Sequence, residues 1–254
     1  METLIIAFSM YSRIPMPDID WNPRNMRYVF CWFPFIGLVI GAFELAAYLF
    51  FVSFLHVSTP LAGAVLTAIP LAVTGGIHLD GYMDTRDALS SYADRQKMLD
   101  IMKDPHIGAF AVIGGGMYLL LQFGAWCEVC TAGGRMVLIM AFTFALERAL
   151  SGLMAVYLPG ARPGGMLSMI KEPAQIMNTK RILLAEIAGL ALLMLITWWK
   201  GALVVLIAAL IVTLHYRHLA LTRLGGTTGD LAGWFLQKCE LWCLLVLAVA
   251  AHLF

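Results

Sequence analysis

The sequence predicts an all-α integral membrane protein, a polytopic helical bundle with about seven transmembrane helices. Hydrophobic residues make up 61% of the 254 positions, and the mean hydropathy is +0.81. Only 13% of the residues are charged, which is about half the share usual in soluble domains. Long apolar runs recur along the whole chain, so we expect a single membrane domain that covers residues 1–254.

The apolar runs predict where the chain crosses the bilayer. A helix needs roughly 20 mostly apolar residues to span the hydrocarbon core. Residues 3–12 are apolar but too few to cross, and we expect them to form a helix on the membrane surface. The predicted spans are 28–55, 59–77, 108–127, 135–158, 183–199, 201–221 and 241–254.

The basic residues predict the orientation of the bundle. Of 17 Lys and Arg residues, 14 fall in one set of alternate polar segments, two fall in the opposite set, and Arg148 lies inside a span. Because basic loops face the cytoplasm, we expect the N-terminus and the long polar loops on the cytoplasmic side of the cell inner membrane. These loops include residues of about 78–107 and 222–240, so the chemistry is expected at that face.

The cysteines and the net charge indicate little. Cys127 and Cys130 form a lone C-x-x-C, and Cys239 and Cys243 lie one helical turn apart. A structural zinc site needs further ligands at a defined spacing, so we interpret these cysteines as small hydrophobic residues. The redox state of Cys127 and Cys130 stays open, and a net charge of +1 gives no reason to expect a nucleic acid partner.

The strongest candidate for chemistry is HLDGYMDTRDAL, residues 78–89. Asp80, Asp84 and Asp87 follow an i, i+4, i+7 spacing, which places them on one face of a helix, where like charges repel. A divalent cation offsets that repulsion, and Mg²⁺ prefers carboxylate oxygens together with substrate phosphates. The alternative is a solvated helix start, where the helix dipole favours acids. His78 and Arg86 are the candidate substrate contacts in this stretch.

Two other polar stretches fit the same chemistry. In IMKDPHIGAF, residues 101–110, Lys103 is a candidate phosphate ligand and His106 a candidate substrate contact, although a capped span start explains both equally well. In residues 225–240, GGTTGDLAGWFLQKCE, the backbone of Gly229 and the hydroxyl of Thr228 suit a phosphate. The acids of this second stretch, Asp230 and Glu240, lie on one helical face, and the alternative is an N-capped turn.

A few charged residues fall outside these stretches. Glu44, Glu147, Arg148 and Glu186 lie within predicted spans, where charge marks either function or a structural pair. Glu147 and Arg148 are adjacent and are expected to need separate partners, with Glu44 the candidate partner of Arg148.

Two arginines complete the candidates, because Arg13 in YSRIPMP and Arg162 in PGARPGG suit bidentate phosphate recognition. The residues together predict a membrane enzyme that uses Mg²⁺ on a phosphate-containing, pyrophosphate-type substrate.

These stretches resemble the cobalamin synthase family, the adenosylcobinamide-GDP ribazoletransferases. The matching segments occur in order along almost the whole chain: 8–17, 33–42, 74–89, 101–110, 147–150, 159–166 and 225–233, followed by Glu240. The family commonly has HLDGLADTADGL where this chain has HLDGYMDTRDAL. The acids are kept, and Arg86 is the departure that the resemblance does not explain.

The resemblance implies a Mg²⁺-dependent transferase that joins adenosylcobinamide-GDP to α-ribazole, or to α-ribazole 5′-phosphate, and releases GMP. It implies that Asp80, Asp84 and Asp87 hold Mg²⁺ and the pyrophosphate. Asp230 and Glu240 would be further ligands or the general base, and Lys103 and Arg162 would hold the leaving phosphate. It leaves open a homo-oligomer and an association with other cobamide-assembly enzymes.

Three other classes fit the sequence less well. A CDP-alcohol phosphatidyltransferase needs D-G-x₂-A-R-x₈-G-x₃-D-x₃-D, but Tyr-Met-Asp-Thr-Arg follows Asp80-Gly81 here. A polyprenyl transferase needs two acid motifs in separate loops. A transporter or membrane binding protein is expected to carry polar sites near the midplane of paired spans.

Overall fold

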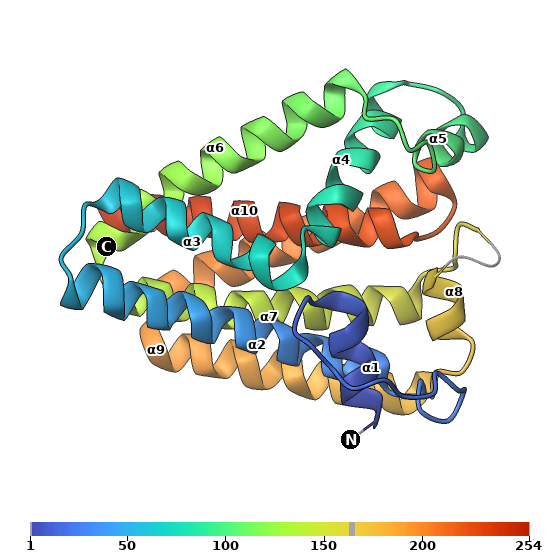
Figure 1. Ribbon diagram of the computed structural model, residues 1–254, viewed down its shortest axis with the longest axis horizontal. Coiled ribbons are helices and arrows are strands. Elements are labelled where there is room, and N and C mark those ends of the chain that lie inside the picture. Colours follow the sequence, from blue (N-terminus) through green and yellow to red (C-terminus); the bar gives the residue numbers. More distant parts are fainter. Residues whose placement is uncertain (1, 163–165, 254) are drawn as a thin grey trace.

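The computed structural model describes residues 2–162 and 166–253, and it confirms the all-α class (Figure 1). No β-strand occurs in the described part of the chain, where an isolated bridge joins Gly160 to Thr227. The helices are α1 Glu2–Tyr11, α2 Val29–Ala47, the π-helix η1 Tyr48–Phe54, α3 Thr59–Thr74, α4 Ile77–Ser90, α5 Arg95–Ile101, α6 Ala109–Ala132, α7 Gly134–Tyr157, α8 Met166–Lys171, α9 Ile176–Leu219, the π-helix η2 Ala220–Leu224 and α10 Gly229–Leu253.

Five helical stretches are long and apolar enough to cross a membrane, and α3 with α4 makes a sixth if that bent pair is one span. The longest stretch runs from Ile176 to Leu224, but its backbone is non-helical at Trp198, with φ −165° and ψ 97°. The ring of Trp198 folds onto Gly201, where an added Cβ would lie 2.1 Å from the ring. This break divides α9 into two arms at the junction of two predicted spans. The count of seven crossings stays a prediction.

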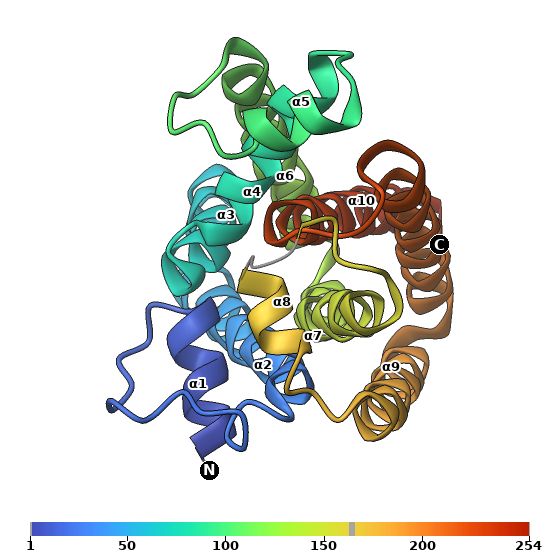
Figure 2. The same cartoon turned by 90° about the vertical axis from the view of Figure 1, so that its right-hand side faces the viewer.

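The bundle is built around α7, and Figure 2 shows α2, α9 and α10 arranged around it. Of the most apolar part of α7, 83% is buried. Helix α2 approaches closely, because a Cβ on Gly37 or Gly41 would lie within 2.4 Å of the α7 backbone. In a membrane, helices are not held together by a hydrophobic driving force, so their association depends on close packing. Small residues allow the two backbones to approach closely enough for it.

Helix α10 joins two segments that the sequence analysis treats separately. The predicted span was 241–254, and the helical face with Asp230 and Glu240 was expected in the polar segment 222–240, but one continuous helix runs from Gly229 to Leu253. The reason is packing, since Leu231, Trp234 and Phe235 are each at most 2% exposed. The acids of this segment therefore lie on a rigid, mostly buried helix.

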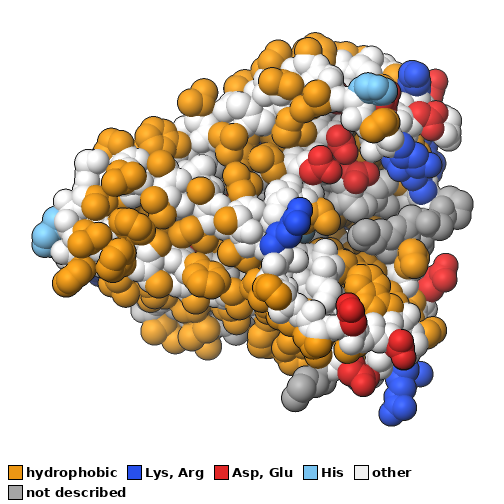
Figure 3. Space-filling view, viewed as in Figure 1, with side chains coloured by type: hydrophobic (Ala, Val, Ile, Leu, Met, Phe, Trp, Pro, Cys, Tyr) orange, Lys and Arg blue, Asp and Glu red, His pale blue; other side chains and the backbone are white. Residues whose placement is uncertain are grey.

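The polar groups gather at one end of the bundle. Figure 1 shows α4, α5 and α8 at this end, and Figure 3 shows most of the visible charged side chains there, with hydrophobic side chains over the remainder. The predicted short helix at residues 3–12 is present as α1, and it packs through the fully buried Ile6 and Ala7. The orientation of this end in the membrane stays a prediction.

Candidate active site

Helix α4 leaves the line of α3 at a bend of 94°. Gly75 and Gly76 form the bend with φ of 67° and 78°, the left-handed region that favours glycine. The Arg13 side chain packs against Gly75, and the Arg13 N–H donates to Val73 O at 2.7 Å. Arg13, a predicted phosphate contact, therefore borders the bend, and it is not among the residues that line the cavities described below.

Helix α4 then crosses the start of α10 in close contact. A Cβ on Gly81 would lie 2.8 Å from the Cα of Asp230, and a Cβ on Gly233 would lie 2.9 Å from His78 O. The absence of side chains at this crossing brings Asp80 and Asp84 of α4 beside Asp230 of α10. The structure thus places the two acid-bearing segments next to each other.

The four aspartates influence one another electrostatically. Burial, and then the carboxylates of Asp80, Asp230 and Asp87, raise the pKa of Asp84 to about 6. An unshifted Asp titrates near 3.9, so the ionised form of Asp84 is disfavoured among its neighbours. A bound cation would reverse that effect.

A cavity of about 290 Å³ opens beside these acids. Asp80 and Asp230 line it together with Arg162, whose charge acts on Asp230. The Arg162 Nη2 donates to Leu99 O at 2.7 Å, which holds the side chain, while its Nε is buried without a partner. The remaining lining residues are Tyr11, Ile77, His78, Gly160, Leu167, Thr227, Thr228 and Gly229.

The start of α10 is fixed by hydrogen bonds. The Thr228 Oγ1 accepts from the Leu231 N–H at 3.0 Å, the geometry of an N-cap. Thr227 exchanges backbone bonds with the other side of the cavity, since its N–H donates to Pro159 O at 2.8 Å and its carbonyl accepts from Ala161 N at 2.9 Å. The first N–H groups of a helix favour an anion, and here they border the cavity at Gly229.

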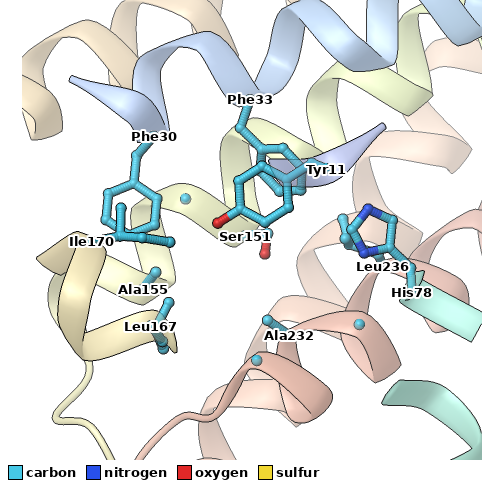
Figure 4. A pocket seen from close by; sticks show the side chains of 13 residues that line it. Tyr11, Phe30, Phe33, His78, Ser151, Ala155, Leu167, Ile170, Ala232 and Leu236 are labelled. Carbon is cyan, nitrogen blue, oxygen red and sulfur yellow. The ribbon is translucent and has the colours of Figure 1, made fainter. Parts of the chain in front are cut away.

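An aromatic recess of about 50 Å³ adjoins this cavity and shares Tyr11, His78, Leu167 and Gly229 with it (Figure 4). The His78 ring lies 5.8 Å from the ring of Phe33 and 6.3 Å from that of Tyr11. His78 is 6% exposed, and its Nε2 has no hydrogen-bond partner. Tyr11 and Ser151 each bring a hydroxyl to the recess.

The sequence analysis did not identify Tyr11, Phe33 or Ser151 as site residues. Tyr11 and Phe33 fall within segments that resemble the family, 8–17 and 33–42. Their position in these segments could have marked Tyr11 and Phe33 as site residues. Nothing in the sequence marked Ser151, because serines are common within buried helices.

Asp87 and Arg86 face α6. The Asp87 Oδ1 accepts from the Ala111 N–H at 3.0 Å, so Asp87 caps the start of α6. A Cβ on Gly108 would lie 1.7 Å from the other Asp87 oxygen, which leaves no space for a larger residue there. Arg86 packs over Gly114 of α6 and does not line the cavity. Asp87 is thus engaged in the structure, and Arg86 lies apart from the other predicted substrate contacts.

Lys103 and His106 lie on the exposed segment between α5 and α6. His106 donates its N–H to Asp104 Oδ1 at 3.0 Å, and its ring Nδ1 lies 2.7 Å from the same oxygen. Neither residue lines the cavity or its recess. The structure therefore places these two predicted contacts outside the cavity lining, on a segment that reaches Asp87 at Gly108.

Glu240 lies elsewhere, which corrects its assignment with Asp230. Ten residues of α10 separate the two acids, about 15 Å along a helix, so they cannot hold the same ion. Glu240 is 1% exposed and accepts from Gln237 Nε2 at 3.1 Å.

Three of the charges within the predicted spans, Glu44, Glu147 and Arg148, lie in the same region as Glu240, whereas Glu186 lies near Cys31. The Arg148 Nη1 donates to Glu147 Oε1 at 2.7 Å, so these neighbours pair with each other. This corrects the expected pairing of Arg148 with Glu44. The Arg148 side chain is long enough to reach its neighbour Glu147 along the same helix. We call Glu44, Glu147, Arg148 and Glu240 the buried charge cluster; each is at most 1% exposed.

The carboxylates near the cavity suit a metal ion whose remaining ligands come from the substrate. Within residues 2–162 and 166–253, no group of three or more His, Cys, Asp or Glu side chains is arranged to hold a metal ion. Asp80 and Asp230 still offer hard oxygens at one cavity edge, with Asp84 beside them, and Mg²⁺ is typically bound by one or two carboxylates plus substrate phosphates. The residues present therefore fit Mg²⁺ bound together with a phosphate. The five cysteines are free thiols.

Comparison with known proteins gives consistent matches over the whole chain. Residues 3–248 match the family model described as cobalamin-5-phosphate synthase. The chain is 40% identical to an adenosylcobinamide-GDP ribazoletransferase of Lachnoclostridium phytofermentans, over 98% of this chain and 94% of that protein. Proteins of the same name from Desulfitobacterium hafniense and Ectopseudomonas mendocina are 34% and 33% identical, each over 96% of this chain and over 96% and 98% of their own lengths. No solved structure matches.

Proposed function

Because the chain belongs to the cobalamin-5-phosphate synthase family, we propose that it joins adenosylcobinamide-GDP to α-ribazole, or to α-ribazole 5′-phosphate, and releases GMP. The product is adenosylcobalamin or its 5′-phosphate. The protein is accordingly a transferase of cobalamin synthesis, and the proposal adds how its residues perform the transfer.

The observation that carries the proposal is the crossing of α4 and α10. It places Asp80 and Asp230 at one edge of a cavity that also presents Arg162 and a helix N-terminus, with Asp84 close enough to feel the charge of both aspartates. Carboxylates at one side and cationic or N–H groups at the other are what a pyrophosphate substrate requires. When bound at Asp80 and Asp84, beside Asp230, Mg²⁺ would supply neutralisation of the phosphate charge.

The transfer needs a hydroxyl of α-ribazole to attack the phosphorus on the cobinamide side. A new O–P bond forms, and the bond from that phosphorus to the oxygen of the GMP phosphate breaks. Asp230, which lines the cavity, would accept the hydroxyl proton while Asp80 and Asp84 hold the metal. Arg162 and the N–H groups at the start of α10 hold the phosphate that leaves, because both favour negative charge.

The aromatic recess suits the base of α-ribazole. Tyr11 and Phe33 offer ring surfaces, and His78 offers a nitrogen without a partner. The guanine of adenosylcobinamide-GDP carries several polar edge groups, and a mostly apolar lining would leave them unpaired. The less polar base of α-ribazole therefore fits the recess better. The corrinoid is too large for this recess of about 50 Å³, and it would lie on the side of the adjoining cavity.

The polar end of the bundle is proposed to face the cytoplasm of the cell inner membrane, where soluble nucleotide substrates are available. The asymmetric distribution of Lys and Arg supports this orientation. Self-association and contact with other cobamide-assembly enzymes are compatible with it.

The activity is tested with the whole protein in nanodiscs, supplied with adenosylcobinamide-GDP, α-ribazole and Mg²⁺. We expect a cobamide and GMP in equal amounts, and none of either when α-ribazole is left out. A parallel reaction receives CDP-diacylglycerol and an alcohol. Release of CMP there, with no cobamide in the first reaction, would assign the protein to the CDP-alcohol phosphatidyltransferases instead.

A further inference from the structure

A long groove runs along the outside of the bundle between the second arm of α9 and α10. It consists of two adjoining cavities of about 430 and 460 Å³ that share Ala208, Ile211, Trp242 and Val246. The lining is apolar from Val204 and Ile207 to Leu253 near the end of the chain. Both helices are apolar enough to cross a membrane, so the groove faces lipid.

The groove ends in a group of basic residues at the polar end of the bundle. His215 and Lys238 line it, and Lys238 interacts electrostatically with Arg86 and with His215. Within residues 2–162 and 166–253, neither Lys238 nor His215 has a hydrogen bond or ion pair to a carboxylate. Arg86, which the candidate active site does not use, lies near the same group.

A buried donor lies at the same place. Trp234 lines the groove and is 2% exposed, yet its Nε1 has no hydrogen-bond partner. Lys238 Nζ lies 5.9 Å from the centre of the Trp234 ring, and the His215 ring meets it edge-on at 5.4 Å. An indole N–H in a buried position usually has an acceptor, and an unsatisfied one costs stability. The site therefore offers the Lys238 ammonium, the His215 ring and an indole donor to an absent acceptor.

We propose that this groove binds an anionic phospholipid, with an acyl chain along Ala208 and Val246 and the phosphate at Lys238, His215 and Trp234. Basic pockets between transmembrane helices bind anionic headgroups. A soluble phosphate would satisfy the head of the site but leave the apolar groove empty. A second copy in the same membrane would bring like charges together at this level, since both copies have the same orientation.

The lipid site is separate from the active-site cavity. Its lining residues, which include Trp234 and Lys238, are absent from the lining of the cavity and of the aromatic recess. The proposal therefore does not depend on the reaction that the protein catalyses, and its test does not use activity.

The test is native mass spectrometry of the purified protein with equal amounts of phosphatidylglycerol and phosphatidylcholine. We expect the wild type to retain phosphatidylglycerol preferentially. Lys238→Gln should reduce that preference roughly five-fold, the effect of one basic residue near a membrane surface. Ala208→Phe should reduce retention of both lipids by filling the groove. Arg217→Gln, which removes the same charge from an exposed position outside the groove, should change nothing.

Several results would overturn the proposal: equal retention of the two lipids, equal effects of Lys238→Gln and Arg217→Gln, displacement of the lipid by inorganic phosphate, or dimers that exclude lipid. A second measurement needs no variant. Phosphatidylglycerol with a photoreactive acyl chain should label the wild type on residues 204–253, and labelling elsewhere would contradict the assignment. Variants are compared only if their thermal melting matches the wild type, and the labelling decides the question if they unfold.

Discussion

Two groups of acidic residues in this bundle have opposite surroundings. The aspartates at the crossing of α4 and α10 border an open cavity, and Asp80 is exposed. In the buried charge cluster, Glu44, Glu147 and Glu240 are fully enclosed, and Arg148 is bonded to Glu147. Acids that remain accessible can bind a cation and a substrate, whereas enclosed acids can be neutralised only by groups within the protein, as Glu147 is by Arg148. The first group is expected to determine activity and the second to determine stability.

The largest effect is expected for Asp84→Asn, which keeps the shape of the side chain but removes a metal ligand. We expect kcat to fall roughly 10³-fold, because the charge stabilisation that a metal supplies is worth several kcal/mol, with unchanged thermal melting. GMP release under saturating substrates measures it. Asp100→Asn, an exposed acid on α5, is the matched control and should retain activity. Normal turnover by Asp84→Asn would remove Asp84 from the site.

The second effect concerns stability. Arg148→Met should lower the free energy of unfolding by about 3–5 kcal/mol, because it leaves the Glu147 carboxylate buried without a partner. Denaturation in mixed micelles measures the loss. The double variant with Glu147→Gln should recover most of it, since no charge is then left unpaired. Equal stability of the single and double variants would contradict the pairing.

The third prediction concerns the aromatic recess. Ala232→Leu narrows the space between His78 and α10 (Figure 4). We expect about a ten-fold higher KM for α-ribazole, because one extra apolar group in a pocket typically changes the binding free energy by about 1–3 kcal/mol. The KM for adenosylcobinamide-GDP should change little. Steady-state kinetics with each substrate varied in turn distinguishes the two. A change confined to the corrinoid substrate would place the base elsewhere.

The fourth prediction is a dependence of Mg²⁺ binding on pH. Burial and neighbouring acids raise the pKa of Asp84 to about 6, so protons compete with the metal below that pH and not above it. Mg²⁺ affinity should fall about ten-fold per pH unit below 6 and level off above it. Calorimetric titration measures the affinity, and Asp84→Asn should remove the dependence. A flat profile from pH 5 to 8 would separate Asp84 from the metal.

The smallest effect is expected for Glu240→Gln. The structure places Glu240 in the buried charge cluster, about 15 Å along α10 from Asp230, so a neutral side chain of the same size should change activity less than three-fold. Sequence analysis had grouped Glu240 with the metal ligands. Loss of activity with unchanged thermal melting would restore that grouping and break the comparison between the two acid groups.

The sequence could predict what depends on local spacing. The i, i+4, i+7 order of Asp80, Asp84 and Asp87 places them on one helix because helix geometry is local. It could not show that Asp87 is taken up by the start of α6, since that contact joins residues 24 positions apart. The apolar runs likewise predicted the helices, but not the bend at Gly75 and Gly76, which directs α4 toward α10.

Burial explains the other differences. The start of α10 at Gly229 depends on packing of Trp234 and Phe235 that composition alone does not reveal. The pairing of Arg148 with Glu147 was missed because helical positions one apart point in different directions, although a long side chain can still reach across. The aromatic recess combines residues from α1, α2, α4, α7, α8 and α10, and no single stretch of sequence contains it.

The contact between Gly81 and the backbone of Asp230 sets a limit on how this protein can diverge. One methyl group at position 81 would lie 2.8 Å from the Cα of Asp230, so α4 would have to move away and the carboxylates would separate. A displacement of about 1 Å can cost 10²-fold in rate. Under the proposed assignment of the recess to the base, its residues can change to accept a different base while the enzyme keeps working. The glycine at the crossing cannot be replaced in the same way, because any side chain there would separate the carboxylates and remove activity.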